Sequence, residues 1–166
     1  ALLQKLIGKP FNEGSLQRMT TDEVAIGLQT LSDFVTIDDA NSGPANLDSI
    51  LRLASTLNRD DKRDALLIDP FNIVAASRDK GESEHDFINA ALGKLRTFAR
   101  AEKMAVFVVA HPTKLQREDG EDEYPVVRPW SINGSAGWFN QADAILSVWR
   151  AMKDSDRTAS GEVEIH

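Results

Sequence analysis

Two apolar segments, residues 65–68 and 104–110, constrain the fold of this chain more than any other feature of its sequence. Each segment is short and continuously apolar, which is typical of strands in a parallel sheet that is covered on both faces. Between them, Ser83-Glu84-His85-Asp86 provides a helix cap, and apolar residues recur at helical spacing as far as Lys103. The order strand, helix, strand predicts a right-handed βαβ unit and therefore an α/β fold.

Each apolar segment ends at a polar residue followed by proline, Asp69-Pro70 in the first and His111-Pro112 in the second. Because ligands of open α/β sheets bind beyond the carboxyl ends of the strands, we expect Asp69 and His111 at one edge. An aspartate there can hold Mg²⁺ beside nucleotide phosphates, and a histidine can donate to a phosphate oxygen. Both residues also have a structural interpretation, Asp69 as a turn cap before Pro70 and His111 as an ordinary strand-end residue.

Residues 1–45 are expected to be a lead-in of helices and a strand that carries no site. The sequence Thr20-Thr21-Asp22-Glu23 has the spacing of a capping box, so a helix should begin there. Gly27 interrupts the apolar stripe of that helix. The apolar residues 34–37 then predict a short strand.

The remaining elements continue the α/β pattern. A second helix is expected to begin at Asn46 or Asp48, and Ser135 can cap a short helix later in the chain. Residues 144–149 predict a third strand, which we expect beside the first two in the parallel sheet. Residues 162–165 alternate between polar and apolar, as strands do.

The composition excludes several classes of protein. The 166 residues suit one domain, and without cysteine they can form neither a disulfide nor a thiolate metal site. No apolar run approaches the roughly 20 residues of a membrane span, and the N-terminus lacks the form of a signal peptide. We therefore expect a soluble, cytoplasmic protein that makes no contact with a membrane.

The charge of the chain limits how it can bind nucleic acid. A formal net charge of −7 opposes a general polyanion-binding surface, so such contacts must come from local basic loops. One candidate loop is the segment 112–129, which has no periodicity and carries Lys114, Arg117 and Arg128 among five acidic residues. This loop directly follows His111.

Several motifs follow one another in a recognisable order between residues 65 and 150. They are Asp-Pro-Phe-Asn at 69–72, Lys-Leu-Arg at 94–96, His-Pro-x-Lys at 111–114, Asn-Gly-Ser-Ala at 133–136, Ala142-Asp143, and a strand ending at Arg150. In this order they resemble the RecA-like motor of hexameric replicative DNA helicases of the DnaB superfamily. The resemblance is greatest to the phage primase-helicases, Twinkle and their bacterial prophage relatives.

That resemblance carries expectations about fold and function. It implies a RecA-like three-layer sandwich with a mainly parallel central sheet flanked by helices, of which the chain would be a partial domain. The segment 65–150 would hold the core from the Walker B residue to the nucleotide and DNA loops. The function implied is that of an ATP-dependent DNA helicase that uses ATP and Mg²⁺, binds single-stranded DNA and assembles as a hexameric ring.

The resemblance also assigns roles to individual residues. Asp69 matches the Walker B carboxylate, which acts on Mg²⁺ through water, and His111 matches the residue that senses the γ-phosphate. Arg150 matches an arginine that stacks on the adenine base. The residues that would contact DNA are Lys114, Arg117, Arg128, Gly134 and Ser135.

The sequence departs from this family in ways that leave alternatives open. It has no G-x-x-x-x-G-K-[ST] motif, so the backbone cradle and the lysine for the phosphates are missing. The DnaB branch has arginine where Ser131 stands and glutamine where Asn140 stands. We therefore expect a piece of a larger helicase that is inactive alone.

The alternatives are a non-catalytic RecA-like module that binds DNA or a partner, and a RecA-like ATPase outside replication. A hydrolase built on His111 with Ser131 or Ser135 lacks the spacing of a nucleophile elbow.

Overall fold

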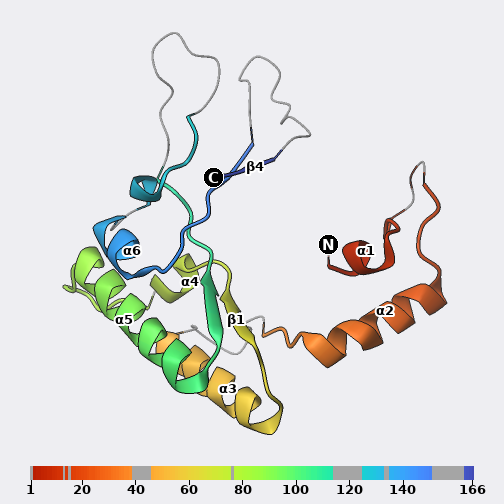
Figure 1. Cartoon of the computed structure of the whole chain (residues 1–166), viewed down its shortest axis with the longest axis horizontal. Helices are drawn as coiled ribbons and strands as arrows, with labels where there is room; N and C mark the ends of the chain where they lie inside the picture. The colour runs from red at the N-terminus through yellow and green to blue at the C-terminus, as the bar shows by residue number, and fades with distance from the viewer. Residues whose placement is uncertain are drawn as a thin grey trace. The chain divides into compact units, whose positions relative to one another are not determined.

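The structure is a computed structural model in which the chain forms two compact units, Ala1–Ser42 and Gly43–His166 (Figure 1). The residues that it describes are 2–12, 14, 16–38, 46–75, 77–113, 125–132, 135–150 and 163–166. Each unit has its own set of contacts.

The first unit consists of two helices, α1 (Leu2–Ile7) and α2 (Thr21–Phe34). The expected capping box at Thr20 is confirmed: its Oγ1 accepts from the backbone N of Glu23 at 3.2 Å, and Glu23 Oε2 accepts from the backbone N of Thr20 at 2.9 Å. Gly27 has a packing role, because a Cβ there would lie 2.5 Å from Cδ1 of Leu3. The glycine that weakens the apolar stripe is thus the point at which α1 approaches α2.

The strand expected at residues 34–37 is wrong. Phe34 is the last residue of α2, and residues 35–38 form no strand. The backbone N of Val35 donates to the carbonyl oxygen of Leu31, at 2.7 Å. This N–H therefore completes the last turn of α2 and is not available to a strand. Strand propensity needs a neighbouring strand to produce a ladder, and no described strand lies in the first unit.

The second unit contains the predicted strand, helix, strand order. Strands β1 (Ala65–Ile68) and β2 (Ala105–Val108) are parallel, in register from Ala65 opposite Ala105 to Ile68 opposite Val108. They are connected by α4 (Asn72–Ala75) and the long helix α5 (Glu84–Glu102). Ser83 caps α5, its Oγ accepting from the backbone N of Asp86 at 3.1 Å, and Lys103 ends it in the left-handed conformation with φ 56°.

A further helix, α3 (Leu47–Asp60), packs beside α5 on one face of the strand pair (Figure 1). Its cap is Asn46, one of the two expected residues, whose Oδ1 accepts from the backbone N of Ser49 at 2.9 Å. Leu66 and Ile68 of β1 point into the core between the strands and these helices. The other core residues are Leu47, Ala54, Phe71, Val74, Ile88, Ala91, Leu92, Leu95, Phe98, Met104 and Trp138.

The opposite face of the strand pair is open. Leu67 and Phe107 lie opposite each other in the register and are 62% and 55% exposed. The expectation that both faces would be covered is therefore wrong for the described part of the chain. A continuous apolar run cannot distinguish one covered face from two, because it has no polar residues to mark the open side.

The predicted third parallel strand is also wrong. Strand β3 (Val148–Trp149) pairs antiparallel with β4 (Glu164–Ile165), in a sheet separate from β1 and β2. Ser147 extends this pairing, because its N–H and C=O are both bonded to His166 at 2.9 Å. The described residues form an α/β arrangement with a small parallel sheet. The strand expected in residues 162–165 is confirmed as β4.

A last pair of elements packs on α5. The 3₁₀ helix η1 (Pro129–Ser131) contacts α6 (Ser135–Gln141), which lies against α5. Trp138 of α6 meets Phe71 edge to face, with ring centres 5.0 Å apart. A Cβ at Gly137 would lie 2.5 Å from Oδ1 of Asn89, so a side chain at this position would have to displace Asn89 of α5. Ser135 is the first residue of this helix, one position inside the expected cap.

One buried polar residue joins three elements. Asn58 of α3 is only 6% exposed, and its Nδ2 donates to Oε2 of Glu102 at 2.9 Å and to the carbonyl oxygen of Glu102 at 3.3 Å. Its Oδ1 accepts from the backbone N of Arg63 at 2.9 Å. These bonds connect the ends of α3 and α5 to the turn before β1, and they satisfy both ends of the amide.

Candidate functional site at the carboxyl edge of the parallel strands

The predicted common edge of Asp69 and His111 is confirmed. Asp69 follows β1 directly and His111 lies three residues after the end of β2; the two strands run in parallel, and hydrogen bonding continues beyond the ladder. The N of Val109 donates to the carbonyl oxygen of Ile68 at 2.9 Å, and the N of Phe71 donates to the carbonyl oxygen of Val109 at 2.8 Å. The chain on either side of Asp69 is therefore held against Val109, two residues before His111.

Both candidate side chains are open to solvent. Asp69 and His111 are exposed, and the peptide bond between Asp69 and Pro70 is cis. A carboxylate and an imidazole at an exposed strand edge can respectively orient metal-bound water and donate to an anion. What each of them does remains a prediction.

The described residues contain no group of three or more His, Cys, Asp or Glu side chains that could hold a metal ion. A single carboxylate at a strand end fits the way Mg²⁺ is usually bound beside nucleotides. The ion keeps several waters and takes one or two carboxylates together with oxygens of the phosphates. Asp69 thus suits a shared metal site in which the nucleotide supplies further ligands.

The other predicted site residues lie in different places. Arg150 is exposed and follows β3, so the structure does not place it on the edge formed by β1 and β2. Arg128 is exposed and precedes η1, and Ser135 begins α6. Lys114, Arg117 and Gly134 lie outside the described residues.

A link between the edge and the later segment was missed by sequence reasoning. Thr113 lies two residues after His111, and its backbone N and Oγ1 both donate to the carbonyl oxygen of Ser131, at 2.8 and 2.9 Å. The two ends of the intervening loop therefore meet. Nothing in the sequence around Thr113 indicates an acceptor so far along the chain.

Sequence reasoning also missed the role of Trp130. The guanidinium carbon of Arg128 lies 5.4 Å from the centre of the Trp130 ring, within the range of a cation–π contact. Beside this pair is a cleft of about 380 Å³, whose apolar lining includes Val126, Val127 and Ile145. A tryptophan two residues after an arginine was the signal available in the sequence.

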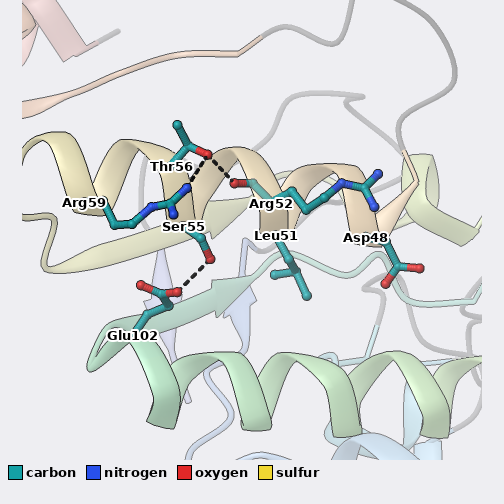
Figure 2. Close-up of a pocket in the computed structure, with 7 residues that line it drawn as sticks. All are labelled: Asp48, Leu51, Arg52, Ser55, Thr56, Arg59 and Glu102. Atoms are coloured by element: carbon teal, nitrogen blue, oxygen red, sulfur yellow. Dashed lines mark hydrogen bonds between the residues drawn. The ribbon is translucent and has the colours of Figure 1, made fainter.

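A larger hollow, of about 560 Å³, lies elsewhere, between α3 and the end of α5 (Figure 2). Figure 2 shows Ser55 donating to Oε1 of Glu102, at 2.7 Å, and Arg59 reaching Thr56. Hydrogen bonds from Asn58 and Ser55 lower the pKa of Glu102 below its ordinary value. The hydrogen bond between Ser55 and Glu102 joins the two helices at this hollow. We therefore interpret the hollow as part of the helix packing and not as a ligand site.

An ion pair joins the same two helices further along. Lys94 Nζ of α5 lies 2.8 Å from Oδ1 of Asp48 in the first turn of α3, and this bond lowers the pKa of Asp48. Both side chains are more than half exposed, so the pair contributes little to stability.

Comparison with known proteins adds one relative. No protein-family model matches the chain. The chain is 30% identical over 154 residues to the Twinkle homolog protein, chloroplastic/mitochondrial, of Arabidopsis thaliana. The alignment covers 90% of this chain but only 21% of the relative, so the chain spans about a fifth of its length. This relative bears the name of a family that the motifs resemble, and the similarity supports a relation to helicases.

None of the helices in the described ranges is long and apolar enough to cross a membrane.

Proposed function

We propose that this chain is part of a replicative DNA helicase or primase-helicase, with a RecA-like core, that couples hydrolysis of Mg-ATP to movement along single-stranded DNA. In this proposal the intact protein works as a hexameric ring. The observation that carries it is the parallel pairing of β1 and β2, because that pairing brings Asp69 and His111 to one edge. The similarity to the Twinkle homolog protein supports the same assignment.

The chemistry of the edge follows from these two side chains. Bound Mg²⁺ would neutralise charge on the phosphates, and Asp69 would hold it through a water molecule. His111 would donate a hydrogen bond to a γ-phosphate oxygen and lose this contact when the phosphate leaves. Arg150 would stack on the adenine base. The residues that would bind single-stranded DNA are Lys114, Arg117, Arg128, Gly134 and Ser135.

In this proposal, coupling between nucleotide and DNA would follow a short path. Thr113, two residues after His111, is bonded to Ser131 beyond the proposed DNA loop. A change in the position of His111 would therefore act on both ends of that loop. A sensor of this kind contributes to coupling only through the difference between the free energy of its contact with the triphosphate and with the diphosphate.

The role of Asp69 is tested by the ATPase rate of the intact protein with single-stranded DNA. Asp69→Asn should lower kcat about 100-fold or more, because the metal-bound water would lose the carboxylate that holds it while the fold remains. Asp64→Asn is the matched control, since Asp64 is also exposed but lies at the opposite end of β1. An Asp69→Asn enzyme with the full rate would contradict the proposal.

Coupling is tested separately with His111→Ala. This variant should bind nucleotide almost normally but lose the stimulation of its ATPase by single-stranded DNA. His85→Ala, at the start of α5, removes an exposed histidine away from the edge and should keep the stimulation. If His111→Ala keeps it as well, the chain is better interpreted as a RecA-like ATPase core outside replication.

A second candidate function is a RecA-like module that binds DNA or a protein partner without hydrolysing ATP. The observation that favours it is the absence of a G-x-x-x-x-G-K-[ST] motif from the 166 residues. On either proposal these residues alone should hydrolyse no ATP. The two candidates differ in the intact protein, which is a DNA-stimulated ATPase only on the first.

A further inference from the structure

Trp130 exposes a large aromatic ring to solvent. The residue is 64% exposed in the 3₁₀ helix η1, which packs against α6. The guanidinium of Arg128 covers one side of the ring, at 5.4 Å from its centre. A flat aromatic surface therefore remains open to solvent with a cation fixed behind it.

The backbone that carries Trp130 is anchored at two points. The carbonyl oxygen of Ser131 accepts two hydrogen bonds from Thr113, at 2.8 and 2.9 Å. On the other side, the Oγ of Ser147 donates to the carbonyl oxygen of Val127. The backbone on either side of the ring is thus held before any ligand arrives, which reduces the conformational entropy that binding must cost.

The space beside the ring is small and partly apolar. The neighbouring cleft holds about 380 Å³, near the lower end of the roughly 300–1,000 Å³ range of small-ligand sites. Val126, Val127 and Ile145 line it together with Trp130. A cleft of this size accepts one flat group and is too small to hold a helix or a strand of a partner protein.

We propose that Trp130 is a stacking platform for an unpaired nucleobase of single-stranded DNA, with Arg128 behind the ring and able to reach a neighbouring phosphate. This inference rests on the proposed function and deepens it, by adding a contact to a base. Stacking on aromatic rings tolerates every base, as a protein that moves along DNA requires. It also needs no net positive charge, and the formal charge of this chain is −7.

The test compares two strands of equal length bound to the intact protein, one of thymidines and one of abasic sites. Trp130→Leu should weaken binding of the thymidine strand roughly 5- to 150-fold and leave binding of the abasic strand unchanged. Trp130→Phe should retain most of the affinity, because it keeps a ring. The slope of affinity against salt should not change in Trp130→Leu, since no phosphate contact is removed.

Phe139→Leu is the matched control. Phe139 of α6 is 66% exposed and has no cation over its ring among the described residues, so its loss should affect neither strand. If Trp130→Leu and the unchanged protein bind the thymidine strand equally well, the stacking inference is overturned while the proposed function stands. An unchanged protein without affinity for either strand would overturn the proposed function itself.

Three further outcomes would also overturn the inference. If Trp130→Leu loses the same affinity for the thymidine strand and for the abasic strand, Trp130 acts by keeping contacts to the DNA backbone in place. Lower affinity for ATP with normal affinity for DNA would show that the base belongs to a free nucleotide. Loss of assembly with normal binding of DNA would make Trp130 part of an interface between proteins.

Discussion

Thr113 donates two hydrogen bonds to a single acceptor, the carbonyl oxygen of Ser131, from its backbone N at 2.8 Å and its Oγ1 at 2.9 Å. This contact connects the residue next to the His111-Pro112 sequence with the 3₁₀ helix that carries Trp130. The hydrogen bond from Oγ1 can be removed by a substitution at Thr113 that leaves the bond from the backbone N in place.

Thr113→Val should therefore reduce stimulation of the ATPase by single-stranded DNA more than it reduces the basal rate. One hydrogen bond contributes about 0.5–1.5 kcal/mol, so the stimulation should fall roughly 2- to 12-fold. Thr113→Ser is the control because it keeps the hydroxyl. Equal rates in the Val and Ser variants would show that the side-chain bond does not transmit the signal.

Gly137→Ala should destabilise the chain by about 1 kcal/mol, because the new Cβ would lie 2.5 Å from Oδ1 of Asn89. The gain in helix propensity from glycine to alanine offsets part of this overpacking. In a chain that already carries Asn89→Ala, the same substitution should be neutral or stabilising. Urea unfolding of the two single variants and the double variant measures the interaction, and additive effects would contradict the contact.

Asn58→Ala should be among the most destabilising polar substitutions in the second unit. It removes the bonds to Glu102 and leaves the backbone N–H of Arg63 without its acceptor. The free energy of unfolding should fall by about 2–3 kcal/mol. Asn140→Ala, at an exposed position of α6, should change it by no more than about 0.5 kcal/mol. Similar results for the two variants would contradict the structural role of Asn58.

Glu102→Gln should change the pH dependence of stability. Hydrogen bonds from Asn58 and Ser55 lower the pKa of Glu102 below the ordinary value of 4.5 in the folded chain. Its carboxylate therefore stabilises the fold above that value, and this contribution is lost as the pH falls through the lowered pKa. The unfolding free energies of the two proteins should differ at neutral pH and converge in acid.

The matched control is Glu82→Gln, which removes one negative charge from the loop before α5. It separates the general effect of charge on acid unfolding from the local effect of the bonds to Glu102. Curves for Glu102→Gln and Glu82→Gln that run parallel from neutral to acid pH would contradict the prediction.

The parts of the fold that could be predicted depend on signals close together in the sequence. Helix caps at Thr20, Asn46 and Ser83 act within three residues, and each is confirmed. The parallel pairing of β1 and β2, with Asp69 and His111 at one edge, follows from a helix long enough to cross over between two apolar strands.

The failures all concern partners distant in the chain. Residues 34–37 and 144–149 both have strand composition, but only a hydrogen-bonded neighbour decides whether and where a strand forms. The second segment pairs with residues 164–165 and not with β1 or β2. The bonds between Thr113 and Ser131 depend equally on the three-dimensional arrangement, as does the cleft beside Trp130. The roles assigned to Asp69 and His111 remain predictions.

The open face that carries Leu67 and Phe107 has a practical consequence for anyone who prepares these residues. Large apolar side chains exposed opposite each other on one face of a strand pair form a patch to which other chains can adhere. Concentrated samples should therefore self-associate. Leu67→Thr and Phe107→Thr keep strand propensity and leave the buried side chains of β1 and β2 untouched, so they are the substitutions with which to make the chain tractable in solution.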